Sequence, residues 1–595
     1  MTVVRQLGVY VVVGLVFLAA QSTRAQSGAR AQSQTSSISP SADWPLHNLA
    51  LSNSRYSPLD EINASNAGAL RQAWTFDAPA SGNIGSMTPI VVDGVMYFNS
   101  GSTLFAVDGA TGKNVWTFRL PQSFQGGGRG PAYGDGRIYA FGPSVMYAVD
   151  AKTGTAVESF GKNGVLRIVN DVLRFKYPGK FPVEFEPTAL GYSMTNPPTY
   201  FNGTLYVGMP FSDSLLPGGL LAAVDGRTGA IKWVFNTVPQ GPQDDGWDLA
   251  KDTWSGPNRF GGGIWTTPAI DPELGMIFVN AANPSPNYDG SSRKGANLFT
   301  NSLVALNLST GKLMWHFQTL HHDIWDWDLV SGPVLFDVQV GGRTLKGIGS
   351  LGKNCHATFL NRQDGRPINP IVETVVPTVT DVPGDQVWPT QPVAYTAFGQ
   401  PQLPFCSVYP IVRDPALATR VRPSYYPYQV GEFVITAPGN TGGSNYGGPS
   451  FSPRTGLLYA TGKNDAWSIK VKPVGDTLKP GPGNMGHFGV IAERGETGVT
   501  PTTSVAAYEP GTGRLAWQVE LAGLTNGGTV VTAGDVLFQT IGNGDIHALD
   551  ARTGKSLFRF TAPKGIRASP LTYRSKGKQF VAIVATNSVL SFALP

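Results

Sequence analysis

Cysteine and charge are both scarce in this 595-residue chain. It has two cysteines, Cys355 and Cys406, and only 14% of its residues are Asp, Glu, Lys or Arg. No Cys-x-x-Cys-His sequence occurs, which excludes a covalently attached c-type haem. The net charge of +5 comes without a basic run, so no nucleic-acid partner is indicated. The sequence leaves open whether the two cysteines lie close enough to pair.

Long apolar runs are absent after the N-terminus. The one extended run, 7–20, follows Arg5 and precedes small residues at 23–25 and 29–31 that suit a signal-peptide cleavage site. It is shorter than the roughly 18 residues expected of a transmembrane helix. We therefore predict an exported, periplasmic protein with a signal peptide over 1–25 and a disordered tail over 26–43. An uncleaved N-terminal anchor is the alternative.

Glycine and proline are abundant, with 73 and 46 residues, and aromatic residues make up 11% of the chain. This composition is typical of a turn-rich all-β protein rather than a helical or disordered one. A phrase of the form Ala-x-Asp-x-x-Thr-Gly-x-x-x-Trp also recurs. Clear copies span 106–116, 223–233, 305–315 and 507–517, weaker ones span 148–158 and 548–558, and a faint one surrounds 361–365.

Each copy of this phrase predicts a strand, a tight turn closed by Thr-Gly, and a second strand. Asp108 and Asp150 stand about 40 residues apart, as do Glu509 and Asp550, and this period suits a four-stranded blade. The length alone would suggest several domains, but the repeat predicts one ring. We expect an eight-bladed β-propeller of four-stranded antiparallel blades over 44–595, closed by pairing of the N-terminal strand with the last blade. The repeated tryptophans, Trp116, Trp233, Trp315 and Trp517, are expected to pack between blades.

Because a propeller serves unrelated functions, the site must be inferred from individual residues. The segment 321–328 places three carboxylates, Asp323, Asp326 and Asp328, between two tryptophans. Desolvation by the indoles would make at least one of these carboxylates basic enough to accept a proton. The alternative is that the carboxylates cap turns and the tryptophans belong to the core.

Two further segments are weak signals individually. Three glycines precede Trp265, so the backbone could approach a ligand beside a large flat ring. Asn283 begins a proline-rich turn whose amide oxygens suit a hard cation.

Taken in order, these phrases resemble the pyrroloquinoline quinone (PQQ)-dependent alcohol and sugar dehydrogenases, quinoproteins with an eight-bladed propeller. The resemblance runs from about residue 44 to residue 589, and it is closer to the glucose dehydrogenase branch than to the methanol dehydrogenase branch. It is carried by the phrases at 55–59, 129–133, 261–265, 283–284, 321–328, 353–365, 388–392 and 438–445.

The resemblance implies PQQ as cofactor and assigns residues to it. Trp265 would form the floor beneath the planar ring, and Arg129 and Thr195 would bind its acidic groups. Lys353 would donate to the reactive quinone oxygen and act in catalysis. Two amides of the 438–445 phrase complete the predicted cofactor set: Asn440 and Asn445.

The resemblance also implies a metal, Ca²⁺ or a lanthanide, and a base. Asp326 matches the general base that accepts the proton of the alcohol. The oxygen ligands would come from Asp213, Asn283, Asp326 and Asp328. Asp328 occurs in both the lanthanide-using and the glucose-type relatives, so it does not identify the metal.

The sequence departs from the family pattern near the cofactor. Ser86 stands where a glutamate is usual, Tyr446 replaces a tryptophan, and Ser214 replaces an asparagine. Gln125 and three glycines replace the usual approach to Arg129. A quinoprotein that has lost its cofactor is therefore one alternative. A second is a non-catalytic propeller scaffold of the outer-membrane assembly type.

The expected function is oxidation of an alcohol, polyol or sugar-like hydroxyl by an exported dehydrogenase. Hydride would pass to the C5 position of the quinone, with an Asp base and a metal Lewis acid. Without haem in this chain, electrons would leave to an external acceptor such as a soluble cytochrome c or a quinone. Substrate selection is expected in two segments without repeats, 210–220 and 373–428.

Overall fold

The computed structural model describes residues 43–79, 86–121, 128–190, 192–210, 216–217, 219–257, 259–475 and 491–595. All of these residues belong to one compact unit. The predicted signal peptide and the predicted tail as far as residue 42 lie outside the described residues. Within the part that is described, no helix has both the length and the apolar character needed to cross a membrane.

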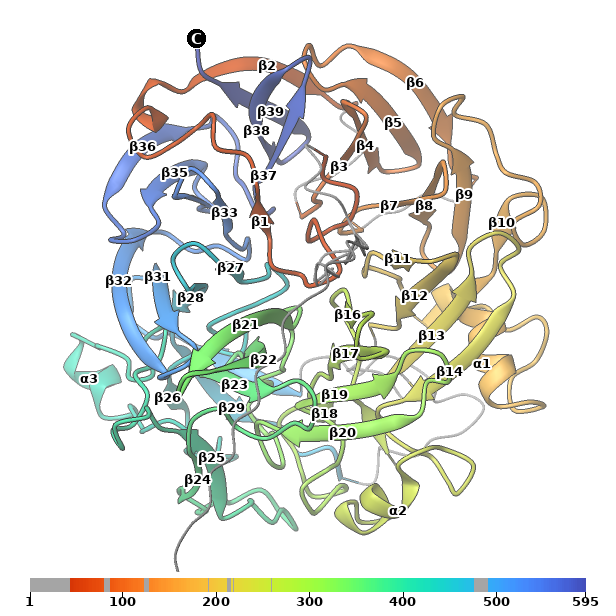
Figure 1. Cartoon of the computed structure of the whole chain (residues 1–595). Helices are drawn as coiled ribbons and strands as arrows, with labels where there is room; N and C mark the ends of the chain where they lie inside the picture. Colours follow the sequence, from red (N-terminus) through yellow and green to blue (C-terminus); the bar gives the residue numbers. More distant parts are fainter. Residues whose placement is uncertain are drawn as a thin grey trace, which may run out of the picture. The chain divides into compact units, whose positions relative to one another are not determined.

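The fold is an all-β propeller, in which antiparallel sheets follow one another around a central axis (Figure 1). The first four sheets in chain order have four strands each. Their strands are β3 (Ile90–Val92), β4 (Val95–Ser100), β5 (Thr103–Asp108) and β6 (Asn114–Arg119); β7 (Ala132–Gly134), β8 (Arg137–Phe141), β9 (Met146–Asp150) and β10 (Val165–Leu166); β11 (Thr199–Phe201), β12 (Thr204–Gly208), β13 (Leu220–Asp225) and β14 (Ile231–Asn236); β16 (Ala269–Asp271), β17 (Met276–Asn280), β19 (Ser302–Asn307) and β20 (Leu313–Gln318).

The later sheets have three to five strands. They contain β21 (Val334–Val340), β22 (Arg343–Leu351) and β23 (Ala357–Asn361); β27 (Ser450–Ser452), β28 (Leu457–Asn464), β31 (Thr502–Glu509) and β32 (Arg514–Ala522); β33 (Val530–Thr532), β34 (Val536–Thr540), β35 (Asp545–Asp550) and β36 (Ser556–Thr561), with β1 (Tyr56–Ser57) parallel to β33; β37 (Leu571–Ser575), β38 (Lys578–Ala585), β39 (Ser588–Ala593) and β2 (Arg71–Asp77).

Smaller elements decorate the ring. The additional sheets are β15 (Phe260–Gly261) with β18 (Pro284–Ser285), β24 (Ile371–Val375) with β25 (Thr390–Ala394), and β26 (Val434–Thr436) with β29 (Trp467–Val471) and β30 (Ala492–Gly495). The short helices are α1 (Ile168–Lys176), α2 (Trp247–Ala250), α3 (Pro415–Ala418) and the 3₁₀ turns η1 (Ala67–Ala69), η2 (Pro187–Leu190) and η3 (Lys251–Thr253).

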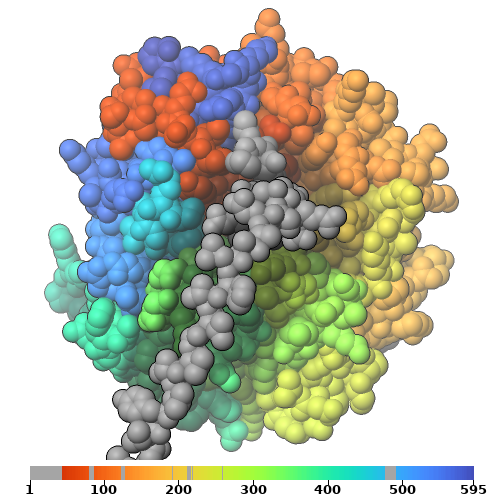
Figure 2. All heavy atoms as spheres, viewed as in Figure 1, coloured from red at the N-terminus to blue at the C-terminus, as the bar shows by residue number. Residues whose placement is uncertain are grey.

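The ring closes by pairing the two ends of the chain. Strand β2 is antiparallel to β39, with Arg71 opposite Ala593 and Asp77 opposite Ser588. Figure 2 shows the red N-terminal and blue C-terminal segments side by side on the surface of this sheet. The predicted closure by an N-terminal strand is therefore confirmed. The N-terminal strand thus completes the last four-stranded sheet as its edge strand and joins the two ends of the chain.

The repeated phrase joins neighbouring blades. Within one copy, Asp108 Oδ1 accepts hydrogen bonds from the amide and the hydroxyl of Thr111, at 2.9 and 3.0 Å, which closes the turn between β5 and β6. The indole of Trp116 donates to the carbonyl of Ala151 in the next copy, at 3.0 Å.

The glycine of each turn is required by the neighbouring tryptophan. At Gly154, where φ is 70°, a Cβ would lie 2.6 Å from the ring of Trp116. The same contact recurs between Gly311 and Trp233, Gly365 and Trp315, and Gly554 and Trp517. The repeated tryptophans therefore pack between blades, as predicted.

Candidate active site

The glycine-rich segment and the Asn283 segment pair with each other. Strand β15 is antiparallel to β18, and the amide of Gly262 donates to the carbonyl of Asn283 at 2.9 Å. A Cβ at Gly261 would lie 2.4 Å from the same carbonyl, so only glycine permits this approach. The two sequence signals, each weak individually, thus form one structural unit that leads directly into Trp265.

Two cations lie beside the ring of Trp265. The guanidinium carbon of Arg129 is 5.6 Å and the ammonium of Lys353 is 5.2 Å from the ring centroid. Arg129 also donates to the carbonyl of Trp265 and lies 4.5 Å from the ring of Tyr446. Its amide donates to the carbonyl of Thr195 at 3.0 Å. A flat indole flanked by two positive charges suits a planar ligand with acidic groups.

Asp326, Asp328 and Lys353 form a buried cluster. The Lys353 ammonium lies 3.2 Å from Asp326 Oδ1 and 3.0 Å from the Asp326 carbonyl, and it forms an ion pair with Asp328 Oδ2. Lys353 is 3% exposed and Asp328 is fully buried. The backbone amide of Lys353 donates to the Asp328 carbonyl at 3.0 Å, which holds the two segments together. One lysine therefore balances two carboxylates.

Asp326 is held by two further side chains. Asn440 Nδ2 donates to Asp326 Oδ2 at 2.9 Å and to the Tyr288 hydroxyl at 2.7 Å. The Tyr288 hydroxyl in turn lies 3.3 Å from Asp326 Oδ2. Asp326 has a φ of 62°, a left-handed conformation that is uncommon for non-glycine residues and concentrated at functional sites.

Tyr288 was not identified from the sequence. Its burial raises its pKa well above the ordinary value, with the charge of Asp326 adding to the effect, so the hydroxyl stays protonated and can donate to the carboxylate. The one available signal was its position in the turn that follows Asn283. That position did not indicate that the Tyr288 hydroxyl would contact Asp326, which is 38 residues away in the sequence.

Replacing Tyr288 with phenylalanine is expected to lower turnover by about tenfold, with a small effect on substrate KM, because a donor to Asp326 is lost while the ring remains. Steady-state kinetics and thermal unfolding test this expectation. Tyr428→Phe is the matched control, because its hydroxyl contacts Thr436 and its ring lies against Tyr288. Equal effects of both substitutions on turnover would contradict a role of Tyr288 at Asp326.

Asp323 has a structural task, unlike the other two carboxylates of the phrase. Its oxygens accept hydrogen bonds from the amides of Trp325 and Trp327, both at 2.8 Å, and from Asn301 Nδ2 at 3.2 Å. Burial raises the pKa of Asp323 to about 6. The two indoles stack on each other in the core, with centroids 5.3 Å apart. The structural alternative therefore holds for Asp323 and for both tryptophans.

Asn283 offers an oxygen atom that could hold a cation next to the cluster of Asp326, Asp328 and Lys353. The backbone amide of Asn283 donates to Asp328 Oδ1 at 2.9 Å, and Asn283 is fully buried. Its side-chain oxygen has no hydrogen-bond partner among the described residues. A buried amide oxygen without a donor is a suitable cation ligand, and the backbone of the same residue contacts the Asp328 carboxylate.

The remaining predicted ligand, Asp213, lies outside the described residues. Over the described ranges, no group of three or more His, Cys, Asp or Glu side chains is arranged to hold a metal. The predicted ligand set differs from such a group, because it combines carboxylates with the amide of Asn283.

Asn445 lies on the same loop as Asn440 but has different contacts. Its Nδ2 donates to the Thr441 carbonyl at 2.9 Å, and its Oδ1 accepts from the Tyr446 amide. These bonds shape the loop that brings Tyr446 to Arg129. Ser86, one of the predicted departures from the family pattern, is partly exposed.

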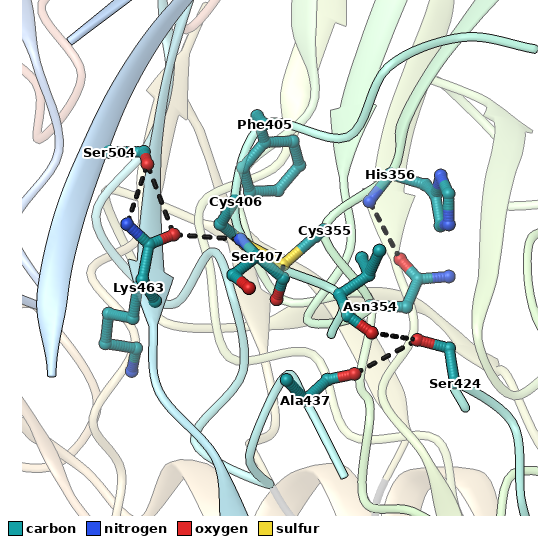
Figure 3. Close-up of a disulfide and its surroundings, with 12 residues drawn as sticks. Asn354, Cys355, His356, Phe405, Cys406, Ser407, Ser424, Ala437, Lys463 and Ser504 are labelled. Carbon is teal, nitrogen blue, oxygen red and sulfur yellow. Dashed lines mark hydrogen bonds between the residues drawn. A yellow bond between two sulfur atoms is a disulfide. The ribbon is translucent and has the colours of Figure 1, made fainter. Parts of the chain in front are cut away.

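The two cysteines form a disulfide two residues beyond Lys353 (Figure 3). The amide of Phe405 donates to the Cys355 carbonyl at 3.0 Å. A Cβ at Gly443 would lie 2.3 Å from Cys406 Sγ, so the loop of Asn440 packs directly on the bridge. The sequence left this pairing open, and the structure places it at the end of the segment that carries Lys353.

Removing the disulfide with the double substitution Cys355→Ala and Cys406→Ala is expected to lower the free energy of unfolding by about 2–4 kcal/mol, because the bridge closes a long loop of the unfolded chain. Denaturant unfolding with and without a thiol reductant measures this change. An intact wild-type protein whose stability does not change on reduction would contradict it.

The comparisons with known proteins agree with this geometry. The family model described as glucose/ethanol/alcohol dehydrogenase, beta-propeller domain (PQQ), matches residues 44–488. A second model, described as outer membrane protein assembly factor BamB, matches residues 501–590.

Similar proteins include the dehydrogenase subunit of a quinone alcohol dehydrogenase from Gluconacetobacter polyoxogenes, 31% identical over 91% of this chain and 71% of the relative. The glycerol dehydrogenase large subunit of Gluconobacter oxydans is 27% identical over 93% of this chain and 84% of its own length.

Among solved structures, the quinohemoprotein alcohol dehydrogenase from Comamonas testosteroni is 25% identical, with a TM-score of 0.73 over 94% of this chain and 81% of that chain. A europium-containing methanol dehydrogenase shares the fold, at 21% identity and a TM-score of 0.71, over 94% of this chain and 99% of its own. The chain thus belongs to the PQQ-dependent dehydrogenases of the glucose/ethanol/alcohol dehydrogenase β-propeller family.

Proposed function

We propose that this protein oxidises the hydroxyl group of an alcohol, polyol or sugar-like substrate to a carbonyl, with PQQ and a metal bound at the Trp265 cluster. The observation that carries the proposal is the convergence of Lys353, Asn440 and Tyr288 on Asp326, next to an indole flanked by Arg129 and Lys353. The names of the relatives, alcohol and glycerol dehydrogenases, indicate the same class of substrate.

Asp326 is the base in this proposal. Its carboxylate accepts the proton of the substrate hydroxyl, and Lys353, Asn440 and Tyr288 fix its orientation. Arg129 would bind acidic groups of the cofactor, Trp265 would stack against its ring, and the Thr195 hydroxyl would donate to the same acidic groups. When bound, PQQ supplies the acceptor of the hydride, at C5. Lys353 places a positive charge where negative charge develops.

Asn283, Asp326 and Asp328 would hold Ca²⁺ or a lanthanide, together with Asp213. Asn283 contributes the buried oxygen that has no donor among the described residues, and the backbone amide of Asn283 binds Asp328. A bound cation supplies Lewis acidity next to the base. Oxygen ligands of this kind are those that hard cations prefer.

Electrons would leave to a separate acceptor, such as a soluble cytochrome c or a quinone, because the sequence has no c-type haem attachment. We also propose export to the periplasm. The apolar run at 7–20 supports a signal peptide, and the disulfide between Cys355 and Cys406 fits an oxidising compartment. We also propose that the chain is closer to the glucose dehydrogenase branch of the family than to the methanol dehydrogenase branch.

The scaffold alternative explains less of the structure. The assembly-factor model matches only the last part of the chain, which contains none of the proposed site residues. A scaffold would have no use for a buried cluster of two carboxylates and a lysine, which costs desolvation energy.

A dye-reduction assay tests the proposed function. Purified protein is incubated with PQQ and either Ca²⁺ or La³⁺, and then given a panel of primary alcohols, secondary alcohols, polyols and sugars. We expect turnover with at least one class, dependent on both PQQ and metal. Absence of turnover with every combination, together with no retained PQQ absorption after gel filtration, would overturn the proposal. The Trp265→Ala variant is the control in the same assay, and it is expected to lose bound PQQ because the indole proposed to stack against the cofactor is removed.

A further inference from the structure

Lys463 is a buried lysine to which the proposed chemistry gives no task. It lies near the end of β28 and is 2% exposed. Its ammonium donates to the Thr441 carbonyl at 2.6 Å and to Asn526 Oδ1 at 2.7 Å. Across the described part of the chain, it forms no ion pair within 4 Å. Figure 3 shows Lys463 beside the disulfide, with its ammonium directed away from the sulfur atoms.

The loop that Lys463 binds, 439–445, reaches both members of the catalytic pair. Asn440 donates to Asp326 Oδ2 at 2.9 Å. Gly442 packs on Lys353 so closely that a Cβ would lie 2.3 Å from the lysine Cβ. The amide of Gly443 donates to the Lys353 carbonyl at 2.7 Å. The position of this loop therefore sets where Asp326 and Lys353 lie relative to each other.

Lys463 holds the loop at two points and connects it to the next blade. Its own amide donates to the Gly443 carbonyl at 3.0 Å, and its ammonium binds the Thr441 carbonyl two residues earlier. The second acceptor of the ammonium, Asn526, precedes β33, and the Asn526 carbonyl accepts from the amide of Gly447 at 3.0 Å. Lys463 thus holds the loop at Thr441 and Gly443, and its partner Asn526 holds the chain just beyond the loop at Gly447.

A charged group at this position has a cost that an apolar residue would avoid. Burial, and then the positive charge of Lys353, lower the pKa of Lys463 to about 7, and the charge of Asp465 opposes this shift only in part. Both acceptors of its ammonium are neutral oxygens. Desolvating an ammonium costs several kcal/mol, and hydrogen bonds to neutral groups offset only part of this cost. Its presence here is therefore better explained by the geometry that its bonds impose than by stability.

We propose that Lys463 is a positioning residue for the Asp326–Lys353 pair and acts through the 439–445 loop and Asn440. The inference rests on the proposed function where it concerns turnover, but the tethering of the loop can be measured independently of activity.

The test compares Lys463→Met with the wild-type protein by hydrogen–deuterium exchange and by kinetics. The substitution keeps the length and burial of the side chain and removes the ammonium. We expect amide exchange in 439–447 to rise by about tenfold, with unchanged exchange in the distant strand β5. In the loaded enzyme, kcat is expected to fall by about tenfold or more while substrate KM changes little.

A double-mutant cycle with Asn440→Ala separates positioning from general destabilisation. If Lys463 acts through Asn440, Lys463→Met should lower kcat less than about twofold in the Asn440→Ala background. Lys232→Met is the control for loss of a lysine at a distant site, because this exposed lysine on the outer strand β14 of another blade also donates to a threonine oxygen, at 2.8 Å, and pairs with Asp225.

Wild-type exchange in 439–447 for Lys463→Met would overturn the proposal, and so would full additivity in the cycle. If Lys463→Met fails to fold, Asn526→Ala retains the lysine, removes one acceptor, and is expected to raise the same exchange. Absence of turnover in the wild-type protein would refute the proposed function, whereas the exchange measurement would still decide the tethering.

Discussion

Replacing Asp326 with asparagine is expected to lower kcat by about 10²-fold or more, the usual effect of losing a positioned base. The amide keeps the shape of the carboxylate but cannot accept the substrate proton at neutral pH. PQQ binding is expected to persist, because Trp265 and Arg129 are unchanged. Steady-state kinetics, together with PQQ absorption after gel filtration, measure the two effects separately.

Asp323→Asn is the matched control for Asp326→Asn, because Asp323 is an acidic residue of the same segment, 321–328, and was an equally plausible candidate from residue type alone. The Asp323 carboxylate accepts hydrogen bonds from the amides of Trp325 and Trp327. The substitution should therefore lower the free energy of unfolding by about 1–3 kcal/mol and leave kcat of the folded protein within a few-fold of the wild-type value. Near-wild-type turnover of Asp326→Asn would remove that residue from the role of base.

Replacing Lys353 with methionine has the second large expected effect, on both stability and turnover. The ammonium balances Asp326 and Asp328, and its loss removes the positive charge that faces both carboxylates, one of which is fully buried. We expect the free energy of unfolding of the metal-free protein to fall by about 3 kcal/mol or more. In the loaded enzyme, turnover should fall by about 10²-fold, with a smaller effect on PQQ retention.

Metal addition and a surface lysine provide the controls for Lys353→Met. Ca²⁺ or La³⁺ should stabilise the variant more than the wild-type protein, because the cation replaces the missing positive charge at the carboxylates. Lys346→Met removes an ion pair with the exposed Glu273 and should change stability by about 1 kcal/mol or less. If Lys353→Met lost PQQ but kept its metal-free stability, Lys353 would be a cofactor ligand and not the counter-ion of the cluster.

The repeated phrase made the fold predictable because its information is local. Asp108, Thr111 and Gly112 close a turn within a few residues, so their spacing is visible in the sequence. The tryptophan of each copy needs space that only glycine in the following copy leaves free, and this is why both residues recur. Each copy of the phrase therefore contains the residues of its own turn and one of the two residues, tryptophan or glycine, of each contact with a neighbouring blade.

The site was predictable only where a residue lies in a recognisable phrase. Trp265, Asn283, Asp326 and Lys353 were found in this way, and the structure brings them together. The composition of the 321–328 segment did not separate Asp323 from Asp326, because both are acidic residues in one short turn, and only the family resemblance singled out Asp326. Their difference arises from the amides of Trp325 and Trp327, which face Asp323.

The sequence by itself determined the all-β ring, the family resemblance and most residues of the candidate site, because repeats and family phrases are written in the order of the chain. Only the tertiary structure decided the pairing of Cys355 with Cys406, the contact of Tyr288 with Asp326, and the hold of Lys463 on the 439–445 loop. These contacts join residues that are 22 to 51 positions apart in the chain. Their distances depend on how the connecting loops and strands pack on one another, and no local pattern records that geometry.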